Sequence, residues 1–304
     1  MADIDRLLLR RTIAFANDKG GVFKTSLVAA IGALLAQAEH RVLLIDLDPQ
    51  ANLGEDLGYT TQSGVNPDAL AEALIDGEEL RPFSGVRTNL DAVCGGRRTY
   101  EVQRALISGD LSRAALAEAL QPVAGRYDVI LIDTPPKSPE LVDLALVAAR
   151  YMIIPARSDS SSRKGLSTMA EQYGEAQEAN PTLELLGICL TGIGQQSTRI
   201  RRRAFQAMHE DFGGEAPLFD TTIRYVESAA HDVREYGKAP HELEVLVEQA
   251  EPFWKRLRSK STAPVVAASA GSLAQDYQSL TQEILGRLVE AEQTLAQQQQ
   301  ESGR

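Results

Sequence analysis

The chain has 304 residues, 43% of them hydrophobic, and a formal net charge of −11. These values allow the core of one large α/β domain or two small ones, and they exclude a protein coated in positive charge. The two cysteines, Cys94 and Cys189, have no spacing typical of a zinc site or a disulfide framework. With no 18-residue apolar run and an acidic start unlike a signal peptide, the sequence predicts a cytoplasmic protein that does not span a membrane.

Short apolar segments alternate with helix-length amphipathic stretches, which predicts an α/β fold with a mostly parallel twisted sheet and helices on both faces. The expected strands are 12–16, 41–47, 89–93, 127–132, 151–155 and 185–191. Residues 25–38 carry their apolar side chains on one helical face, so a helix is expected directly after a loop. Two or three weaker helices are expected between residues 54 and 125, where no boundary divides the chain.

The C-terminal part is predicted to complete a single domain over residues 1–295. A loop or linker is expected at 252–271, because the sequence turns basic and then becomes rich in alanine and serine. Helical spacing of apolar residues predicts a closing helix at 272–295. Residues 296–304 contain four consecutive glutamines and are predicted to be a disordered tail.

The loop after the first expected strand has the composition of a phosphate-binding loop. Glycines let backbone amides point inward, and the N-terminus of the following helix adds partial positive charge. Lys24 is placed to reach the β- and γ-phosphates of ATP, and Thr25 to ligate Mg²⁺. Asp18 and Phe23 stand where the common pattern has its two glycines. The residues predicted to bind the nucleotide are Lys19, Gly20, Gly21, Val22, Phe23, Lys24, Thr25 and Ser26.

The loop at 19–25, Lys-Gly-Gly-Val-Phe-Lys-Thr, resembles the deviant Walker A loop of the ParA/MinD family. Two further segments carry the resemblance. Residues 43–52 contain an Asp-x-Asp pair like that of ParA partition ATPases, and residues 129–136 are similar to the Walker B strand of the family. The resemblance covers roughly residues 10–240 plus the closing helix, and it implies a P-loop NTPase fold that binds ATP and Mg²⁺.

Three acidic residues and one additional lysine complete the predicted site. Asp133, at the end of an apolar strand, is expected to hold Mg²⁺ through water. Strand alternation places Asp46 and Asp48 on one face. The resemblance implies that Asp46 supports the metal and that Asp48 orients the attacking water. It also implies that Lys19 reaches the nucleotide of a facing subunit, so that Lys19, Lys24 and Asp48 serve hydrolysis in a homodimer that sandwiches two ATP molecules.

Arginines are concentrated at one place in an otherwise acidic chain. Arginine contacts to phosphates give affinity without sequence choice, which suits non-specific binding to double-stranded DNA and association with the nucleoid. The residues predicted to contact DNA are Arg199, Arg201, Arg202 and Arg203 of this cluster, and Arg224, which the resemblance implies.

The resemblance implies a ParA-type partition ATPase with slow basal turnover. Its ATP-bound dimer would bind DNA and be released when a ParB-like centromere-binding partner stimulates hydrolysis, and the cargo could be a plasmid, a chromosome or a protein assembly. Two alternatives stay open, namely a MinD-like membrane-cycling ATPase and a nucleotide-switched protein scaffold that binds no DNA. The glutamine-rich C-terminus lacks the lysines and large apolar residues of a membrane-targeting helix.

Overall fold

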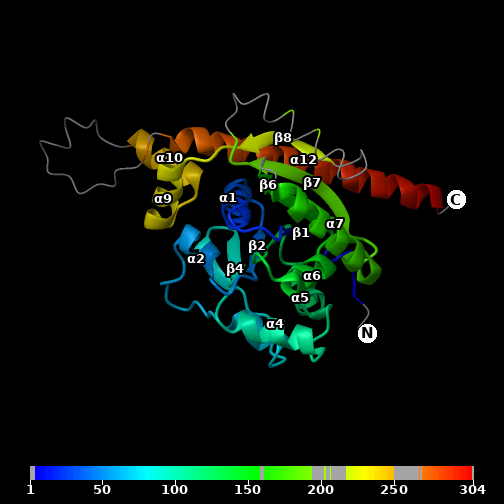
Figure 1. Ribbon diagram of the computed structural model, residues 1–304. Coiled ribbons are helices and arrows are strands. Elements are labelled where there is room, and N and C mark those ends of the chain that lie inside the picture. Colours follow the sequence, from blue (N-terminus) through cyan, green and yellow to red (C-terminus); the bar gives the residue numbers. More distant parts are fainter. Residues whose placement is uncertain are drawn as a thin grey trace, which may run out of the picture.

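The protein is described by a computed structural model (Figure 1), which describes residues 4–157, 161–193, 217–249 and 269–302 and the single positions 202, 206 and 267. In these residues one eight-stranded sheet has the order β3-β4-β2-β5-β1-β6-β7-β8. All neighbouring strands are parallel except β3 and β4, so the predicted fold class is confirmed. The strands are β1 (Thr12–Phe15), β2 (Val42–Asp46), β3 (Phe83–Arg87), β4 (Leu90–Val93), β5 (Val129–Asp133), β6 (Tyr151–Arg157), β7 (Glu184–Thr191) and β8 (Leu218–Ile223).

The central strands are buried on both faces, which explains their continuous apolar sequences. Every residue of β1, β2 and β5 is buried. Six strands begin and end within two residues of the predicted bounds. The two that were not predicted, β3 and β8, lie at the two ends of the sheet. Both mix exposed and buried positions, so their sequences lack the long apolar run that marks a central strand.

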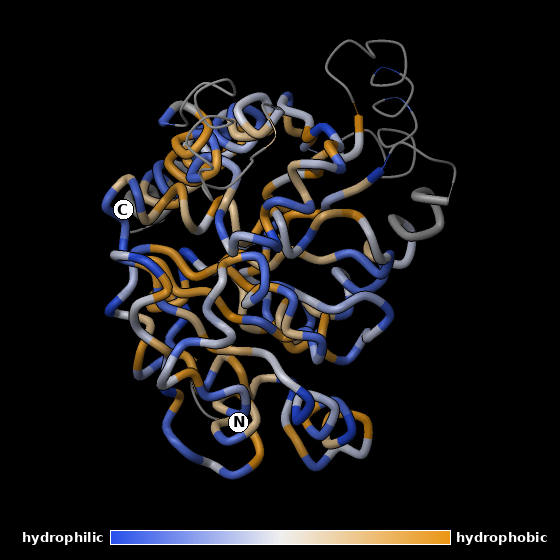
Figure 2. The backbone as a smooth tube through the Cα atoms, turned by 90° about the vertical axis from the view of Figure 1, so that its left-hand side faces the viewer, coloured by the Kyte–Doolittle hydropathy of each residue, from blue (hydrophilic) through white to orange (hydrophobic). Residues whose placement is uncertain are grey.

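Helices cover both faces of the sheet, because alternate strand residues point to opposite sides. Ile13 and Phe15 pack with α1, α2 and α12, whereas Ala14 packs with the helices α3 to α7 on the other face. Figure 2 shows hydrophobic segments running through the interior of the molecule. The helices are α1 (Lys24–Gln37), α2 (Asn52–Leu57), α3 (Ala69–Leu74), α4 (Thr99–Ser108), α5 (Ala115–Ala124), α6 (Pro139–Ala148), α7 (Ser161–Ala179), α9 (Glu227–Tyr236), α10 (Pro240–Gln249) and α12 (Ala270–Ser302).

The closing helix α12 is longer than predicted. It begins at Ala270 and continues to Ser302, so the prediction of a disordered tail does not hold for residues 296–302. Alanine, glutamine and glutamate favour helix, and extending an existing helix avoids the cost of nucleation. Figure 1 shows the C-terminal end of α12 reaching beyond the sheet. Across the described ranges, no helix has a stretch long and apolar enough to cross a membrane.

Two glycines bring the end of α2 against the end of α9. Gly58 and Gly237 both have positive φ angles, of 69° and 58°, as the residues that end these helices. A Cβ atom at Gly237 would overlap Gly58 Cα and lie 2.9 Å from Gly58 N. Arg87 joins the same place, because its guanidinium donates to the carbonyls of Leu57 and Gly237. The contact fixes α2 relative to α9.

We expect Gly237→Ala to lower the free energy of unfolding by about 3 kcal/mol, since it adds backbone strain to a steric overlap. Gly109→Ala is the matched control. Gly109 also ends a helix with a positive φ angle, of 79°, but a Cβ there meets nothing within 4 Å. The control should therefore lose only about 1 kcal/mol. Urea unfolding of both variants measures the difference, and equal losses would contradict the role of the glycine contact.

Candidate nucleotide-binding site

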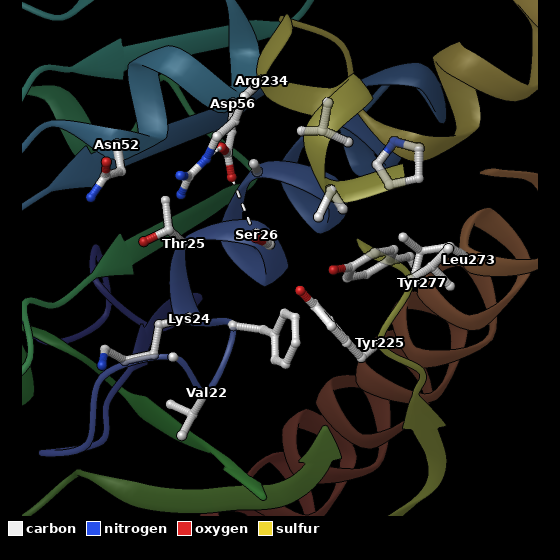
Figure 3. A pocket seen from close by; sticks show the side chains of 18 of the residues that line it. Val22, Lys24, Thr25, Ser26, Asn52, Asp56, Tyr225, Arg234, Leu273 and Tyr277 are labelled. Atoms are coloured by element: carbon white, nitrogen blue, oxygen red, sulfur yellow. Dashed lines mark hydrogen bonds and ion pairs between the residues drawn. The ribbon is translucent and has the colours of Figure 1, made fainter. Parts of the chain in front are cut away.

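The phosphate loop lies at the carboxyl end of β1 and opens into a cleft of about 1090 Å³. Figure 3 shows this cleft between the start of α1, helix α9 and helix α12. Of the predicted nucleotide-binding residues, all from Gly20 to Ser26 line it, whereas Lys19 does not. The rest of the lining mixes apolar side chains, such as Val233 and Leu273, with charged ones, such as Arg234. A cleft with this mixed lining suits a ligand that carries both charged and apolar groups.

Lys24 is held inside the loop. Its Nζ donates to the carbonyl oxygens of Asn17 at 2.9 Å and Lys19 at 3.1 Å. The Asn17 side chain fixes the loop in turn, because it donates to Pro155 O and accepts from the Lys19 backbone amide. Burial lowers the pKa of Lys24, while the nearby Asp133 and Asp48 oppose that shift. The ammonium group is thus positioned by the backbone beside the place where phosphates would lie.

Thr25 and Asp133, the two residues predicted to hold Mg²⁺ from the loop and from the end of β5, lie beside each other. The Thr25 hydroxyl donates to Asp133 Oδ2 at 2.7 Å. Asp46 is the sheet partner of Asp133, so two buried carboxyls stand side by side. Burial raises the pKa of Asp133 to about 7, and burial together with Asp133 raises the pKa of Asp46 well above its ordinary value.

These three residues fit Mg²⁺. Two buried atoms, Asp133 Oδ1 and Asp46 Oδ2, accept no hydrogen bond from any described residue. Unpaired buried carboxyl oxygens are costly, and a hydrated divalent cation would satisfy them. A threonine hydroxyl and aspartate oxygens are the hard ligands that Mg²⁺ prefers. Thr25 lines the cleft itself, whereas Asp133 and Asp46 lie behind it.

Asp48 faces the cleft from the end of β2. Its backbone amide donates to Asp46 Oδ1 at 2.8 Å, and its own Oδ1 accepts the Gln50 amide at 2.8 Å. Asp46 therefore holds the turn that presents Asp48, a contact that strand alternation did not predict. Gly95 makes room for this turn, because a Cβ there would lie 2.5 Å from Asp48 O. Gly95 has no motif around it, so the sequence offered no signal for its role.

The pH dependence of stability follows from the buried carboxyls. Asp133 has a higher pKa in the folded protein than the ordinary 3.8, so the folded state binds more protons between about pH 4 and pH 7. Its contribution therefore lowers the free energy of unfolding of the nucleotide-free protein as the pH rises through this range. We expect Asp133→Asn to be more stable than the parent at about pH 8 without nucleotide, and to lose stabilisation by Mg-ATP.

Urea unfolding at a series of pH values, with and without Mg-ATP, tests this expectation. Asp128→Asn is the control, because the pKa shift of Asp128 has the opposite sign. Hydrogen bonds from Arg41 lower the pKa of Asp128 to about 2. That variant should lose stability at neutral pH and keep its response to Mg-ATP. If Asp133→Asn is less stable than the parent without nucleotide, the cost of burying the ionised carboxylate is not the main effect of Asp133 on stability.

The sequence left the contacts of the nucleoside part of ATP open, and the cleft supplies candidates. Ser26 donates to Asp56 Oδ2 at 3.3 Å, and Arg234 Nε donates to Asp56 Oδ1 at 3.3 Å (Figure 3). Asp56 is buried, and burial raises its pKa against the effect of Arg234. Arg157 also lines the cleft. These residues come from α1, α2, α9 and the end of β6, so no local pattern links them.

The predicted DNA-binding arginines divide into three groups. Arg224 lines the cleft and is held by Asp276, at 2.6 Å from Nε and 2.8 Å from Nη2. Arg202 is exposed. The other three, Arg199, Arg201 and Arg203, lie outside the described residues. DNA contact by all five stays a prediction, and the carboxylate of Asp276 already engages the guanidinium of Arg224.

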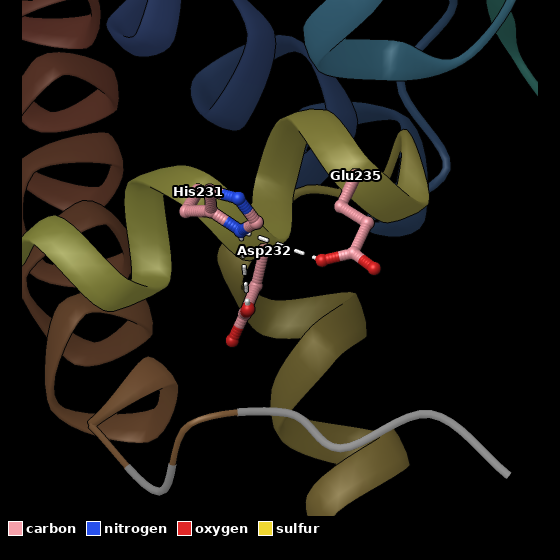
Figure 4. Close-up of side chains that lie close together, drawn as sticks. All are labelled: His231, Asp232 and Glu235. Carbon is pink, nitrogen blue, oxygen red and sulfur yellow. Dashed lines mark ion pairs between the residues drawn. The ribbon is translucent and has the colours of Figure 1, made fainter.

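A second group of metal-ligating side chains lies on α9 (Figure 4). The possible ligand atoms of His231, Asp232 and Glu235 lie within 4.8 Å of one another. His231 Nδ1 is 3.4 Å from Glu235, on the exposed side of the helix. Asp232 Oδ2 already accepts the backbone amide of Ala267 at 2.8 Å. The group is accounted for by ion pairs and by this hydrogen bond, and we assign it no metal.

The parallel sheet, the lysine-bearing glycine loop and the acidic residues beside it define a phosphate-loop nucleotide-binding protein. Comparison with known sequences agrees, since residues 10–185 match the family described as an AAA domain. The chain is 30% identical over 255 residues to the chromosome-partitioning ATPase Soj of Thermus thermophilus. This match covers 79% of this chain and 98% of that protein. It is 35% identical over 189 residues to the chromosome partitioning protein ParA of Myxococcus xanthus, which covers 60% of this chain and 64% of that protein. The chain belongs to the ParA/MinD family of ATPases, as the sequence predicts.

Solved structures share the fold. The ATP complex of McdA from Cyanothece superimposes with a TM-score of 0.72 at 22% identity, covering 91% of this chain and 97% of that one. Cobyrinic acid a,c-diamide synthase of Mycobacterium smegmatis, with bound ADP and magnesium, gives a TM-score of 0.62 at 27% identity. It covers 84% of this chain and 99% of that one. Both of these structures hold an adenine nucleotide, the second together with magnesium.

Proposed function

We propose that the chain is a ParA-type partition ATPase that binds Mg-ATP in the cleft and hydrolyses it. The observation that carries the proposal is the convergence of Lys24, Thr25 and Asp48 at one end of the cleft, with Asp133 behind them. Phosphoryl transfer needs positioning and charge compensation more than covalent help from the protein. These four residues offer both, because one cation, one hydroxyl and two carboxyl groups surround the place for the phosphates.

Each residue has a separate part in the proposed reaction. Lys24 and the loop amides bind the β- and γ-phosphates, and Thr25 and Asp133 hold the metal ion. Bound Mg²⁺ supplies charge neutralisation at the phosphate oxygens. Asp48 orients the attacking water, while Asp46 keeps the Asp48 turn in place. Slow basal turnover is expected, because we assign only Asp48 to the water.

The nucleotide is proposed to control assembly. The backbone amide of Lys19 donates to Asn17 Oδ1, and Lys19 does not line the cleft of its own subunit, which supports a role across a homodimer interface. The ATP-bound dimer would then bind double-stranded DNA non-specifically through arginines that include Arg202. A ParB-like partner would stimulate hydrolysis and release the dimer from DNA, and through this cycle the protein would associate with the nucleoid.

Binding to random-sequence duplex DNA tests this proposal. We expect binding with ATP but not with ADP or without nucleotide, and a steep loss of affinity as salt increases. Arg202→Ala should weaken binding, whereas Arg104→Ala, which removes an exposed arginine from α4, should not. Light scattering measures dimerisation in parallel. If ATP drives dimerisation but no DNA binds at low salt, the protein is a nucleotide-switched scaffold and the DNA part of the proposal is wrong.

A further inference from the structure

Phe23 has an unusual backbone conformation in the phosphate loop. It directly precedes α1 with φ 69° and ψ 23°, in the left-handed region. Glycine adopts this region without strain, but a bulky aromatic residue there is a rare outlier. Such strain persists where the surroundings hold it, and it is concentrated at ligand sites. The strain at Phe23 therefore points to a role for this residue at the ligand site.

The ring of Phe23 packs against Tyr225. The two ring centres are 5.8 Å apart, with 55° between the planes, an arrangement typical of favourable aromatic pairs. Tyr225 is anchored on the other side of the cleft, because its neighbour Arg224 is bound by both oxygens of Asp276 on α12. The pair thus bridges the phosphate loop and the segment after β8. Tyr225 nevertheless remains 53% exposed, which leaves much of its ring open to a ligand.

Both aromatic residues line the same cleft as the phosphate loop. In Figure 3 the hydroxyl ends of Tyr225 and Tyr277 point into the cleft beside Ser26. The phosphate end is formed by the loop amides and Lys24, and in Figure 3 Tyr225 lies away from the ammonium group of Lys24. A nucleoside triphosphate with its phosphates on the loop would therefore place its nucleoside part against the aromatic pair.

We propose that Phe23 and Tyr225 form an aromatic clamp that holds the ribose and base of the bound nucleotide. This inference rests on the proposed function, because it takes the cleft to be the ATP site. Every base has a π-face, so stacking on aromatic rings is tolerant of base identity. The clamp should contribute to the affinity for ATP and GTP alike. It should contribute nothing to the affinity for inorganic tripolyphosphate, which has no nucleoside.

Calorimetric titration with Mg-ATP, Mg-GTP and Mg-tripolyphosphate tests the clamp in Phe23→Gly and Tyr225→Ala. Each variant should lose about tenfold in affinity for both nucleotides, the loss expected when one aromatic contact to a base is removed. The affinity of Tyr225→Ala for tripolyphosphate should stay within about twofold of the parent, since Tyr225 lies outside the phosphate loop. Tyr225→Phe keeps the ring and should bind ATP like the parent. Melting temperatures of the nucleotide-free variants check that they fold.

Three outcomes would overturn the clamp. In the first, both variants keep the ATP affinity of the parent. In the second, ATP and tripolyphosphate affinities fall together, so that the substitution has damaged the loop itself. In the third, monomers bind ATP normally and only ATP-dependent dimerisation is lost, which would place the aromatic pair at a subunit interface. Failure of the proposed function looks different, because the parent protein itself would then not bind ATP.

Discussion

Replacing Lys24 by alanine is expected to lower the affinity for Mg-ATP at least about a hundredfold and to abolish hydrolysis. The substitution removes a buried cation that two backbone carbonyls aim at the phosphate end of the cleft. Hydrogen bonds between charged groups are roughly twice as strong as neutral ones, and the low dielectric of a buried site strengthens them further. Equilibrium binding of a fluorescent ATP analogue measures the loss.

Lys19→Ala is the matched comparison, since it removes the other lysine of the same loop. Lys19 does not line the cleft of its own subunit, so this variant should bind ATP as a monomer with nearly unchanged affinity. It should instead fail to dimerise with ATP, which sedimentation can follow. If the two lysine variants lose ATP binding equally, Lys19 acts within its own subunit and the proposed sandwich dimer is wrong.

Replacing Asp48 by alanine is expected to separate binding from hydrolysis. ATP affinity should stay within a few-fold of the parent, because Asp48 faces the cleft as a carboxylate and offers no positive charge to the phosphates. Turnover should fall by about a hundredfold or more, the loss expected when a group that positions a nucleophile or accepts its proton is removed. The protein should then accumulate in its ATP-bound dimer, with DNA binding retained.

Single-turnover hydrolysis, measured beside ATP affinity, tests this separation. Glu55→Ala is the control, because Glu55 is an exposed acidic residue in α2, near Asp48 in the chain. It should leave both quantities unchanged. An Asp48→Ala protein that binds ATP as weakly as Lys24→Ala would show that Asp48 supports nucleotide binding and does not act only on the attacking water.

The sequence predicted the parts of the fold and the site that depend on local patterns. Buried parallel strands have continuous apolar runs, so the six inner strands were found within two residues. The phosphate loop and the strand-terminal acids could be named as candidates because each combines a strand with characteristic residues at its end. The hydrogen bond between Thr25 and Asp133 joins two such motifs and follows from the parallel order of β1 and β5.

The remaining parts depend on contacts between distant segments. Asp56 joins Ser26 to Arg234, and Phe23 meets Tyr225 across the cleft. Neither contact has a periodic or spaced signature, so only the folded chain reveals it. Arg224 illustrates the same limit, because an arginine that looks like a DNA contact in the sequence has a buried aspartate from α12 as its partner.

The contact between Gly58 and Gly237 has a consequence for how relatives of this protein diverge. A Cβ atom at Gly237 would overlap the backbone of Gly58, and one at Gly58 would lie 3.0 Å from Gly237 Cα, so a larger residue at either position calls for a shift of α2 relative to α9. Because α2 begins four residues after Asp48, such a shift would carry the Asp48 turn with it. A relative with a larger residue at one of the two sites should therefore differ in its rate of ATP turnover, even where every residue of the phosphate loop is the same.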